Sequence, residues 1–316
     1  MADSLTTTAT ATATATEHIG AAGETIPDAY YIRLDDTRFH STLHSQGAWN
    51  AHEQHMASAS GLLIHAVQQN HPRPEVALSQ VTFEILGVIP GGEIEVTTEV
   101  VRPGRTIELI EATLSGNGRP AIRALVWRLL TGDTSEVAGG DGGQLKPPAE
   151  CAPYEMESVW DGGFIASTEF RVAERCRPGS GAAWIRTPYA IVDGEESEPI
   201  ARFMGHVDTA NGIAVRQSPR EYMFPNLDLT VHLFRQPEGD WTGMDTRVHF
   251  GASGVGMTAT DLYDERGLVG KAAQILTVRK FPEPKQSAPT AAASDVDAAH
   301  LCGTCSGFPQ VGETFN

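Results

Sequence analysis

One segment indicates the fold class most clearly, Ile200-Ala-Arg-Phe-Met-Gly-His-Val-Asp-Thr-Ala-Asn-Gly-Ile-Ala-Val215. Its apolar side chains recur at the three- and four-residue spacing of a helix with one buried face. The residues on this face are Ile200, Phe203, Met204, Val207 and Ala214. Strand-like runs follow at 226–234, 241–250, 255–263 and 268–279. An early helix followed by antiparallel strands indicates an α+β unit, in which a sheet wraps around one central helix.

The first part of the chain follows the same plan in the same order. Residues 56–67 read Met-Ala-Ser-Ala-Ser-Gly-Leu-Leu-Ile-His-Ala-Val, with a helical stripe formed by Met56, Ser60, Leu63 and Val67. Strand-like runs follow at 81–85, 94–100, 107–114 and 121–130. Asn117-Gly118, between the last two runs, is a strong signal for a tight hairpin turn.

The two parts can be laid together without gaps, Leu229–Arg235 on Val81–Gly87 and Gly267–Arg279 on Gly118–Leu130. The two helices align on Gly61 and Gly212. A plan that recurs along one chain in the same order indicates an internal duplication. The sequence therefore predicts two tandem helix-wrapped antiparallel sheets.

Three segments lack this periodicity. One is a Thr-Ala repeat, one is rich in Gly, Pro and acidic residues, and one is rich in Ala, Ser and Pro. Such compositions bury too little apolar surface to form a core. The expected organisation is a disordered tail at 1–28, a first unit at 29–132, a linker at 133–157, a second unit at 158–282 and a low-complexity tail at 283–316.

The charge of the chain argues against two classes of partner. It carries 40 Asp and Glu against 23 Lys and Arg, for a net charge of −17, and no Lys/Arg-rich run. Neither nucleic acid nor an anionic membrane is therefore expected to bind through a general field. No apolar run approaches the roughly 18 residues that span a bilayer. We expect a soluble, cytoplasmic protein.

Three polar residues of the second unit stand where the first unit has apolar ones. They are Asp208, Asn226 and Gln274, and their counterparts in the alignment are Ala57, Leu78 and Leu125. Buried polar groups cost several kcal/mol unless they are hydrogen-bonded. Taken singly, each could cap a turn, end a loop or bond to the backbone. Taken together, they predict one shared polar site, kept in the second copy.

These residues carry a resemblance to a known family. The duplicated plan, Asp208-Thr-Ala-Asn-Gly212, Asn226-Leu-Asp228 and Gln274 near the end of the last strand resemble the double-hotdog thioesterase-like family. This group contains acyl-CoA thioesterase II, and the chain resembles its actinobacterial members. The first half agrees in 47–55 and in the Val-Arg-Pro-Gly-Arg turn at 101–105. The resemblance spans roughly 30–282 and implies a double hotdog whose two halves form a pseudo-dimer.

The resemblance implies hydrolysis of acyl-CoA thioesters by a water held between Asp208, Asn226 and Gln274. Acyl-CoA is then the expected partner, with a homodimer as a further option, and neither a cofactor nor a metal is expected. The substrate is expected to lie against His55, Met56, Asn211 and Gly212. The chain departs from acyl-CoA thioesterase II in having Asn226 in place of Thr, and Asp228-Leu229 in place of Asp-His.

Two groups are expected to carry out the chemistry. Asp208 is the expected base, and backbone N–H groups near His55 to Ala57, at the start of the first helix, would polarise the carbonyl if the two halves pack face to face. His52, Glu53 and His55 form a cluster ahead of that helix. The alternatives for this cluster are local hydrogen bonds, shaping of the substrate pocket or a metal site.

Cysteines add little. Cys302 and Cys305 form a C-x-x-C beside His300, for which zinc or redox chemistry is an alternative to a loose tail.

Two rival functions remain open. A hotdog hydratase usually has a His a few residues after its Asp, whereas Thr, Ala, Asn, Gly and Ile follow Asp208. A non-catalytic acyl-binding module is the other rival, and the Asn226 departure favours it.

Overall fold

The structure, a computed structural model, describes residues 26–282. The predicted tail at 283–316, with Cys302 and Cys305, and all but the last three residues of the tail at 1–28 lie outside the described residues. No helix within the described part of the chain is long and apolar enough to cross a membrane.

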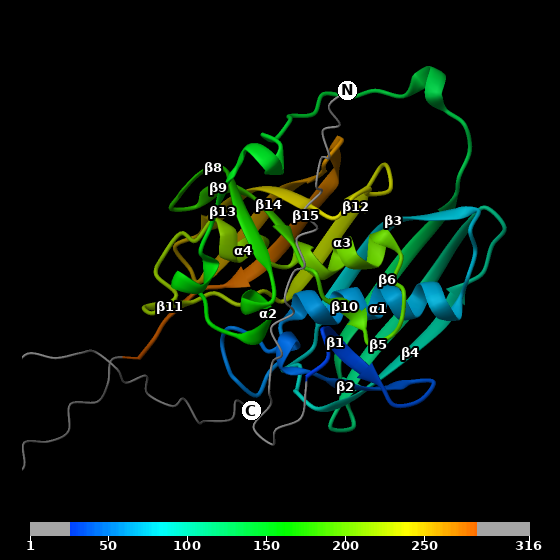
Figure 1. Cartoon of the computed structure of the whole chain (residues 1–316), viewed down its shortest axis with the longest axis horizontal. Coiled ribbons are helices and arrows are strands. Elements are labelled where there is room, and N and C mark those ends of the chain that lie inside the picture. Colours follow the sequence, from blue (N-terminus) through cyan, green and yellow to red (C-terminus); the bar gives the residue numbers. More distant parts are fainter. Residues whose placement is uncertain (1–25, 283–316) are drawn as a thin grey trace, which may run out of the picture. The chain divides into compact units, whose positions relative to one another are not determined.

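The described residues form one fourteen-stranded, mostly antiparallel sheet, with strands of the first half on one side and most strands of the second half on the other (Figure 1). The first half contributes β1 (Ala29–Arg33), β2 (Arg38–Ser41), β3 (Val76–Ile85), β4 (Glu93–Arg102), β5 (Ile107–Gly116) and β6 (Arg119–Leu130). The second half contributes β7 (Ala152–Pro153), β8 (Glu169–Arg177), β9 (Ser180–Arg186), β10 (Ala190–Val192), β12 (Asp228–Leu233), β13 (Thr242–Phe250), β14 (Val255–Asp264) and β15 (Gly267–Thr277). A separate pair joins β11 (Tyr222–Met223) to β16 (Arg279–Lys280).

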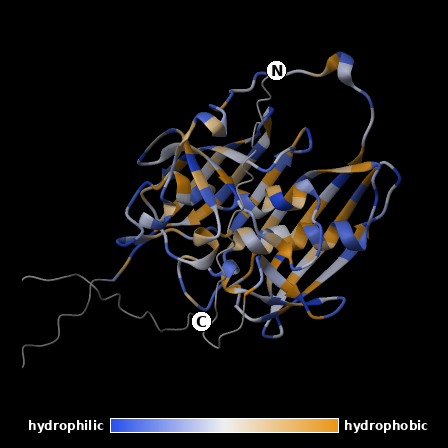
Figure 2. Ribbon diagram, viewed as in Figure 1, coloured by the Kyte–Doolittle hydropathy of each residue, from blue (hydrophilic) through white to orange (hydrophobic). Residues whose placement is uncertain are grey.

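The order of strands explains how the halves are joined. It runs β10-β1-β2-β4-β5-β6-β3-β12-β15-β14-β13-β9-β8-β7, so β3 and β12 pair at the centre. Hydrophobic and hydrophilic residues alternate along the strands, which buries one face of the sheet against the helices (Figure 2). The predicted hairpin is present, because Asn117 and Gly118 adopt positive φ angles of 53° and 72° between β5 and β6.

Two long helices lie side by side against this sheet (Figure 1). They are α1 (Met56–Asn70) and α3 (Pro199–Val207); α2 (Gly163–Ala166) and α4 (Ala210–Ile213) are single turns. The predicted helix at 200–215 is therefore interrupted after Val207. Thr209 donates its hydroxyl proton to the carbonyl of His206, and such local bonds compete with the regular ladder.

The two halves are related as a pseudo-dimer. Thr82 lies opposite Thr230 in the β3–β12 pair, with their hydroxyl oxygens 3.3 Å apart, and Gly61 of α1 lies against Gly205 of α3. A residue on a two-fold axis contacts its own counterpart, so these pairs define the equivalence of the halves.

This equivalence corrects two details of the sequence alignment. The helices match at Gly61 and Gly205, not Gly212, because these two residues face each other where the helices cross, and the tight contact there favours glycine at position 61. Thr230 pairs with Ala273, and its counterpart Thr82 pairs with Leu125, so Ala273 and Leu125 are equivalent. The counterpart of the next residue, Gln274, is therefore Val126 rather than Leu125. Strand alternation then places Gln274 and Val126 on the buried face.

The segment predicted as a linker, 133–157, contains structured pieces. It includes β7 and the 3₁₀ turns η2 (Ser135–Val137) and η3 (Pro148–Glu150), and η4 (Met156–Ser158) begins in it. The carbonyl of Lys146 accepts a hydrogen bond of 2.8 Å from the indole of Trp184. The segment thus packs against the second half, while the exact boundaries between the two units stay a prediction.

Candidate active site

Asp208 ends helix α3 as its C-cap residue, facing the start of α1 from the other half. Its exposed fraction is only 4%. The apolar stripe of the preceding helix explains this burial, because Val207 and Met204 beside it are fully buried in the core. A carboxylate is thereby held in a place where ionisation is costly.

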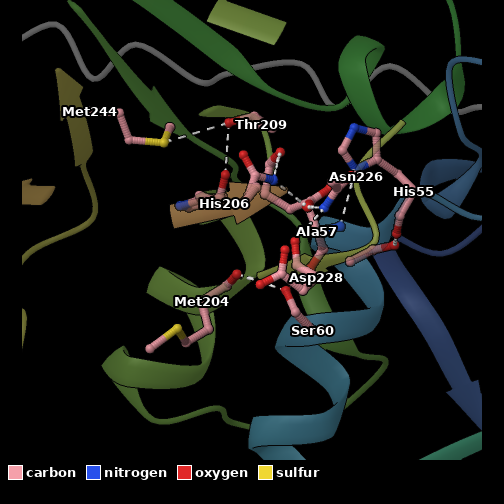
Figure 3. A network of polar contacts seen from close by, with 12 residues as sticks. His55, Ala57, Ser60, Met204, His206, Thr209, Asn226, Asp228 and Met244 are labelled. Atoms are coloured by element: carbon pink, nitrogen blue, oxygen red, sulfur yellow. Dashed lines mark hydrogen bonds and ion pairs between the residues drawn. The ribbon is translucent and has the colours of Figure 1, made fainter. Parts of the chain in front are cut away.

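Two amide side chains converge on this carboxylate, and Figure 3 shows one of them, Asn226, within the polar network that also contains His55. Asn226 Nδ2 donates to Asp208 Oδ1 at 2.7 Å, and Gln274 Nε2 donates to the same oxygen at 2.9 Å. The structure thus brings together the three residues that the sequence grouped. No described residue hydrogen-bonds the second oxygen, Asp208 Oδ2.

Each amide is oriented by a further contact. Gln274 Oε1 accepts a hydrogen bond of 2.8 Å from Thr258 Oγ1, on the neighbouring strand β14, so its NH₂ group must face Asp208. Asn226 Nδ2 also donates to the carbonyl of Asp228 at 3.1 Å. Sequence reasoning missed Thr258, although a Thr on the buried face of a strand was a usable signal.

The site tunes the acidity of Asp208. Burial raises the pKa of this carboxyl to about 7, against the lowering effect of the hydrogen bonds from Asn226 and Gln274. Near neutral pH the group is therefore divided between its protonated and ionised forms. This is the pKa that a general base needs to act at pH 7.

His55 faces Asp208 from the first half. It is the N-cap residue of α1, where its Nδ1 accepts a hydrogen bond of 3.1 Å from the Ala57 N–H. The same nitrogen lies 3.8 Å from Asp208 Oδ2, and the ring stacks on Phe164 at a centroid distance of 4.4 Å. Burial lowers the pKa of His55 to about 4, so the imidazole is neutral at pH 7.

The other predicted substrate contacts lie in two different helices, Met56 in α1 and Asn211 and Gly212 in α4. Met56, the first residue of α1, is buried directly beside His55. Gly212 packs under Trp160, whose indole N–H donates to the Gly212 carbonyl at 3.2 Å. Asn211 lies half-buried in α4. Gly212 thus serves the packing of α4 in this structure.

An aromatic cluster that the sequence did not indicate lies next to Gly212. Trp49 meets Trp160 at 5.0 Å and Phe224 at 5.6 Å, both edge to face. Trp49 is 41% exposed and belongs to the loop that leads into His55, whereas Phe224 lies two residues before Asn226. The cluster therefore joins the two halves beside the Asp208 site.

The pseudo-symmetry generates a second, equivalent position where α1 meets the start of α3. His65 of α1 lies there with Nε2 2.9 Å from Glu195 Oε2 and Nδ1 3.0 Å from Ser197 Oγ. Arg33 of β1 donates to both oxygens of Glu195, at 2.5 and 2.9 Å. Here the sheet offers Leu78 and Val126, so the pair of amides is present at only one of the two positions.

The His52, Glu53 and His55 cluster is dispersed. His52 is exposed, and Glu53 accepts a hydrogen bond of 3.2 Å from Asn50, while His55 points to the Asp208 site. Within residues 26–282 no group of three or more His, Cys, Asp or Glu is arranged to hold a metal ion.

The pseudo-dimeric sheet and its two central helices define a double-hotdog protein with a buried acid–amide site at the interface of the halves. Family models match both halves. The acyl-CoA thioesterase N-terminal domain matches residues 45–129, and the acyl-CoA thioesterase C-terminal domain matches residues 148–278. The chain belongs to the acyl-CoA thioesterase family and is a thioester hydrolase. No curated protein matches its sequence.

Solved structures share the fold at low identity. A hot dog fold protein of unknown function from Alicyclobacillus acidocaldarius has a TM-score of 0.63 at 14% identity, covering 80% of this chain and 97% of its own. An acyl-CoA thioesterase II from Mycobacterium marinum has a TM-score of 0.57 at 14% identity, covering 83% and 98%. A tesB protein from Mycobacterium avium has 0.56 at 15%, covering 79% and 96%. At these identities the likeness concerns the fold.

Proposed function

We propose that the protein hydrolyses acyl-CoA thioesters to a free acid and coenzyme A, with Asp208 as the general base. The observation that carries this proposal is the state of one carboxylate. Asp208 is buried, its pKa lies near 7, one oxygen is held by two amides and the other is free of hydrogen bonds from the described residues. Such a carboxylate is ready to accept a proton at neutral pH.

A thioester carbonyl is already electrophilic, so the enzyme needs a placed water and stabilisation of the oxyanion. In the proposed reaction, a water bound to Asp208 Oδ2 gives its proton to that oxygen while its own oxygen forms a bond to the carbonyl carbon. The carbonyl π electrons move onto the carbonyl oxygen. When the C=O bond re-forms, the C–S bond breaks and the thiolate takes the proton from Asp208.

The two amides have a distinct task in this scheme. By donating to Asp208 Oδ1, Asn226 and Gln274 fix the plane of the carboxylate and leave Oδ2 for the water. Asn226 stands where acyl-CoA thioesterase II has Thr, and its NH₂ group supplies the donor that a hydroxyl would supply. The substitution is therefore compatible with hydrolysis.

Thiol release from a panel of acyl-CoAs of rising chain length tests the proposal. We expect release by the wild type and a loss of at least about a hundredfold in kcat for Asp208→Asn, as for removal of a general base. Asp261→Asn is the matched control, because Asp261 pairs with Lys271 on the outer face of the sheet. Unchanged turnover by Asp208→Asn would show that Asp208 is not the general base.

A hydratase acting on an enoyl thioester is the second candidate, favoured by one observation. His55 lies across from Asp208 at 3.8 Å, although no His follows Asp208 in the sequence. A carboxyl group and an imidazole at one site suit the proton transfers that add water to a double bond. The same panel separates the options, since hydration consumes the enoyl absorbance without thiol release. Binding without any reaction would indicate an acyl-binding module.

A further inference from the structure

We propose that His55 is a second catalytic residue, whose Nε2–H donates a hydrogen bond to the carbonyl oxygen of the thioester and stabilises the oxyanion. The inference rests on the proposed thioesterase function. It assigns the stabilisation to a side chain of the first half, acting on a substrate attacked from the second half.

The hydrogen bond at the start of α1 fixes where the proton of the imidazole lies. A backbone N–H can only donate, so the 3.1 Å contact between Ala57 N and His55 Nδ1 makes Nδ1 the acceptor (Figure 3). A neutral imidazole carries its single proton on the other nitrogen, Nε2. Histidine is not among the residues that usually cap helices, which sets His55 apart from an ordinary cap.

The Nε2–H group is available for a ligand. No residue among 26–282 hydrogen-bonds Nε2 of His55, and 15% of this side chain is exposed to solvent. His206, by contrast, has a buried Nε2 that lacks a partner within the same described residues. Stacking on Phe164 with an interplanar angle of 26° holds the ring of His55 in place. The donor is thus oriented before the substrate arrives, which is the condition for effective oxyanion stabilisation.

The charge state of the ring supports the same role. Burial lowers the pKa of His55 to about 4, and the positive end of the α1 dipole acts in the same direction. The ring therefore stays neutral at every pH where Asp208 works as a base. A neutral N–H that keeps its proton can stabilise negative charge without taking part in proton transfer.

The geometry also gives His55 and Asp208 different roles. His55 Nδ1 is occupied by the Ala57 N–H, so it cannot take a proton from water without breaking the cap. Asp208 Oδ2, 3.8 Å away, has no such partner among the described residues. The base is therefore Asp208, and His55 binds the developing oxyanion through its other nitrogen. His55 neither gains nor loses a proton during the reaction.

Two substitutions of His55 separate its cap role from its donor role. In His55→Asn the amide oxygen takes the place of Nδ1 and still caps Ala57, but the donor at the Nε2 position is lost. In His55→Gln the longer side chain brings its NH₂ group to the Nε2 position, but Gln is a poor cap. His52→Asn is the matched control, because His52 is exposed three residues earlier.

We expect His55→Asn to keep the wild-type Tm within a few degrees and to lower kcat about 10²- to 10³-fold with little change in KM, as for loss of one oxyanion donor. His55→Gln should lower Tm but retain kcat within about tenfold, and His52→Asn should behave as the wild type. If His55→Asn retains as much kcat as His55→Gln, or more, the inference is wrong while the thioesterase proposal stands. If the wild type releases no thiol from any acyl-CoA, both fail.

Discussion

Gly61 of α1 lies against Gly205 of α3 so closely that a Cβ added to Gly61 would come within 3.1 Å of the Gly205 Cα. This contact sits at the crossing of the two central helices, one from each half. It sets the distance between the helices, and with it the distance between His55 at the start of α1 and Asp208 at the end of α3.

The two glycines are not equivalent, which gives a paired prediction. A Cβ on Gly61 meets backbone atoms, including the Ala201 carbonyl oxygen at 3.3 Å, whereas a Cβ on Gly205 meets its nearest atom at an ordinary 3.7 Å. We expect Gly61→Ala to lower the free energy of unfolding by about 1–3 kcal/mol. Gly205→Ala should raise it by up to about 1 kcal/mol through helix propensity. Urea unfolding measures both, and effects of the same sign would contradict this account.

Thr258 is predicted to control activity without touching substrate. Its hydroxyl holds Gln274 Oε1 and thereby turns the NH₂ group toward Asp208. Thr258→Val keeps the shape but frees the amide, so kcat should fall about tenfold, the equivalent of about 1.4 kcal/mol in the barrier. Thr260→Val is the control, because Thr260 forms a buried bond with Thr246 two positions along the same strand. Equal kinetics for both variants would exclude a role for Thr258.

The rate of hydrolysis should depend on pH through Asp208. The base acts in its ionised form, so kcat/KM is expected to rise with pH and to reach half of its plateau near pH 7, where the pKa lies. Asn226 lowers this pKa by its hydrogen bond. Asn226→Ala should therefore move the midpoint to higher pH and reduce the plateau. A midpoint that is unchanged, or moves to lower pH, would argue against this role of the amide.

Much of the fold was within reach of the sequence. The start of α1, the hairpin at Asn117-Gly118 and the strands β3 to β6 and β12 to β15 follow from periodicity and turn residues. The strands that could not be predicted from the sequence are those in which buried and exposed residues do not alternate. Tyr30 and Tyr31 are adjacent in β1 and both buried, and residues 181–185 of β9 are buried in succession. Strands covered on both faces give no period-two signal.

Only part of the site could be predicted from the sequence. Asp208, Asn226 and Gln274 stood out because the duplicated half has apolar residues there, although the helix counterpart was misplaced. His55 was expected to contact the substrate, but its approach to Asp208 could not be predicted, because it depends on how two distant helices pack. Phe164 and Trp160 carried no pattern in the sequence, because their contacts to His55 and Gly212 are purely tertiary.

The second pseudo-symmetric position is predicted to be structural. The hydrogen bonds run from Ser197 to His65 to Glu195, the order found in a serine hydrolase triad. However, Arg33 neutralises Glu195, and Ser197 is buried, with only 6% of its surface exposed. Ser197→Ala should therefore leave acyl-CoA turnover unchanged. Glu195→Gln should lower the free energy of unfolding by about 1 kcal/mol, since its ion pair with Arg33 is partly exposed. Lost turnover in Ser197→Ala would show that this position contributes chemistry.

The ionisation of Asp208 should make the protein less stable as pH rises. The unfolded carboxyl has a pKa near 3.8, whereas the folded one has about 7, so between these values only the unfolded state loses its proton. Stability is therefore full below about pH 4, falls as pH rises toward 7, and then levels off. A shift of this size corresponds to at most about 4 kcal/mol. Asp208→Asn lacks the charge and keeps an oxygen for both amides. Relative to the wild type, its Tm should be higher at pH 8 but little changed at pH 4. A Tm for Asp208→Asn below that of the wild type at pH 8 would mean that the ionised carboxylate is stabilised in the fold rather than strained.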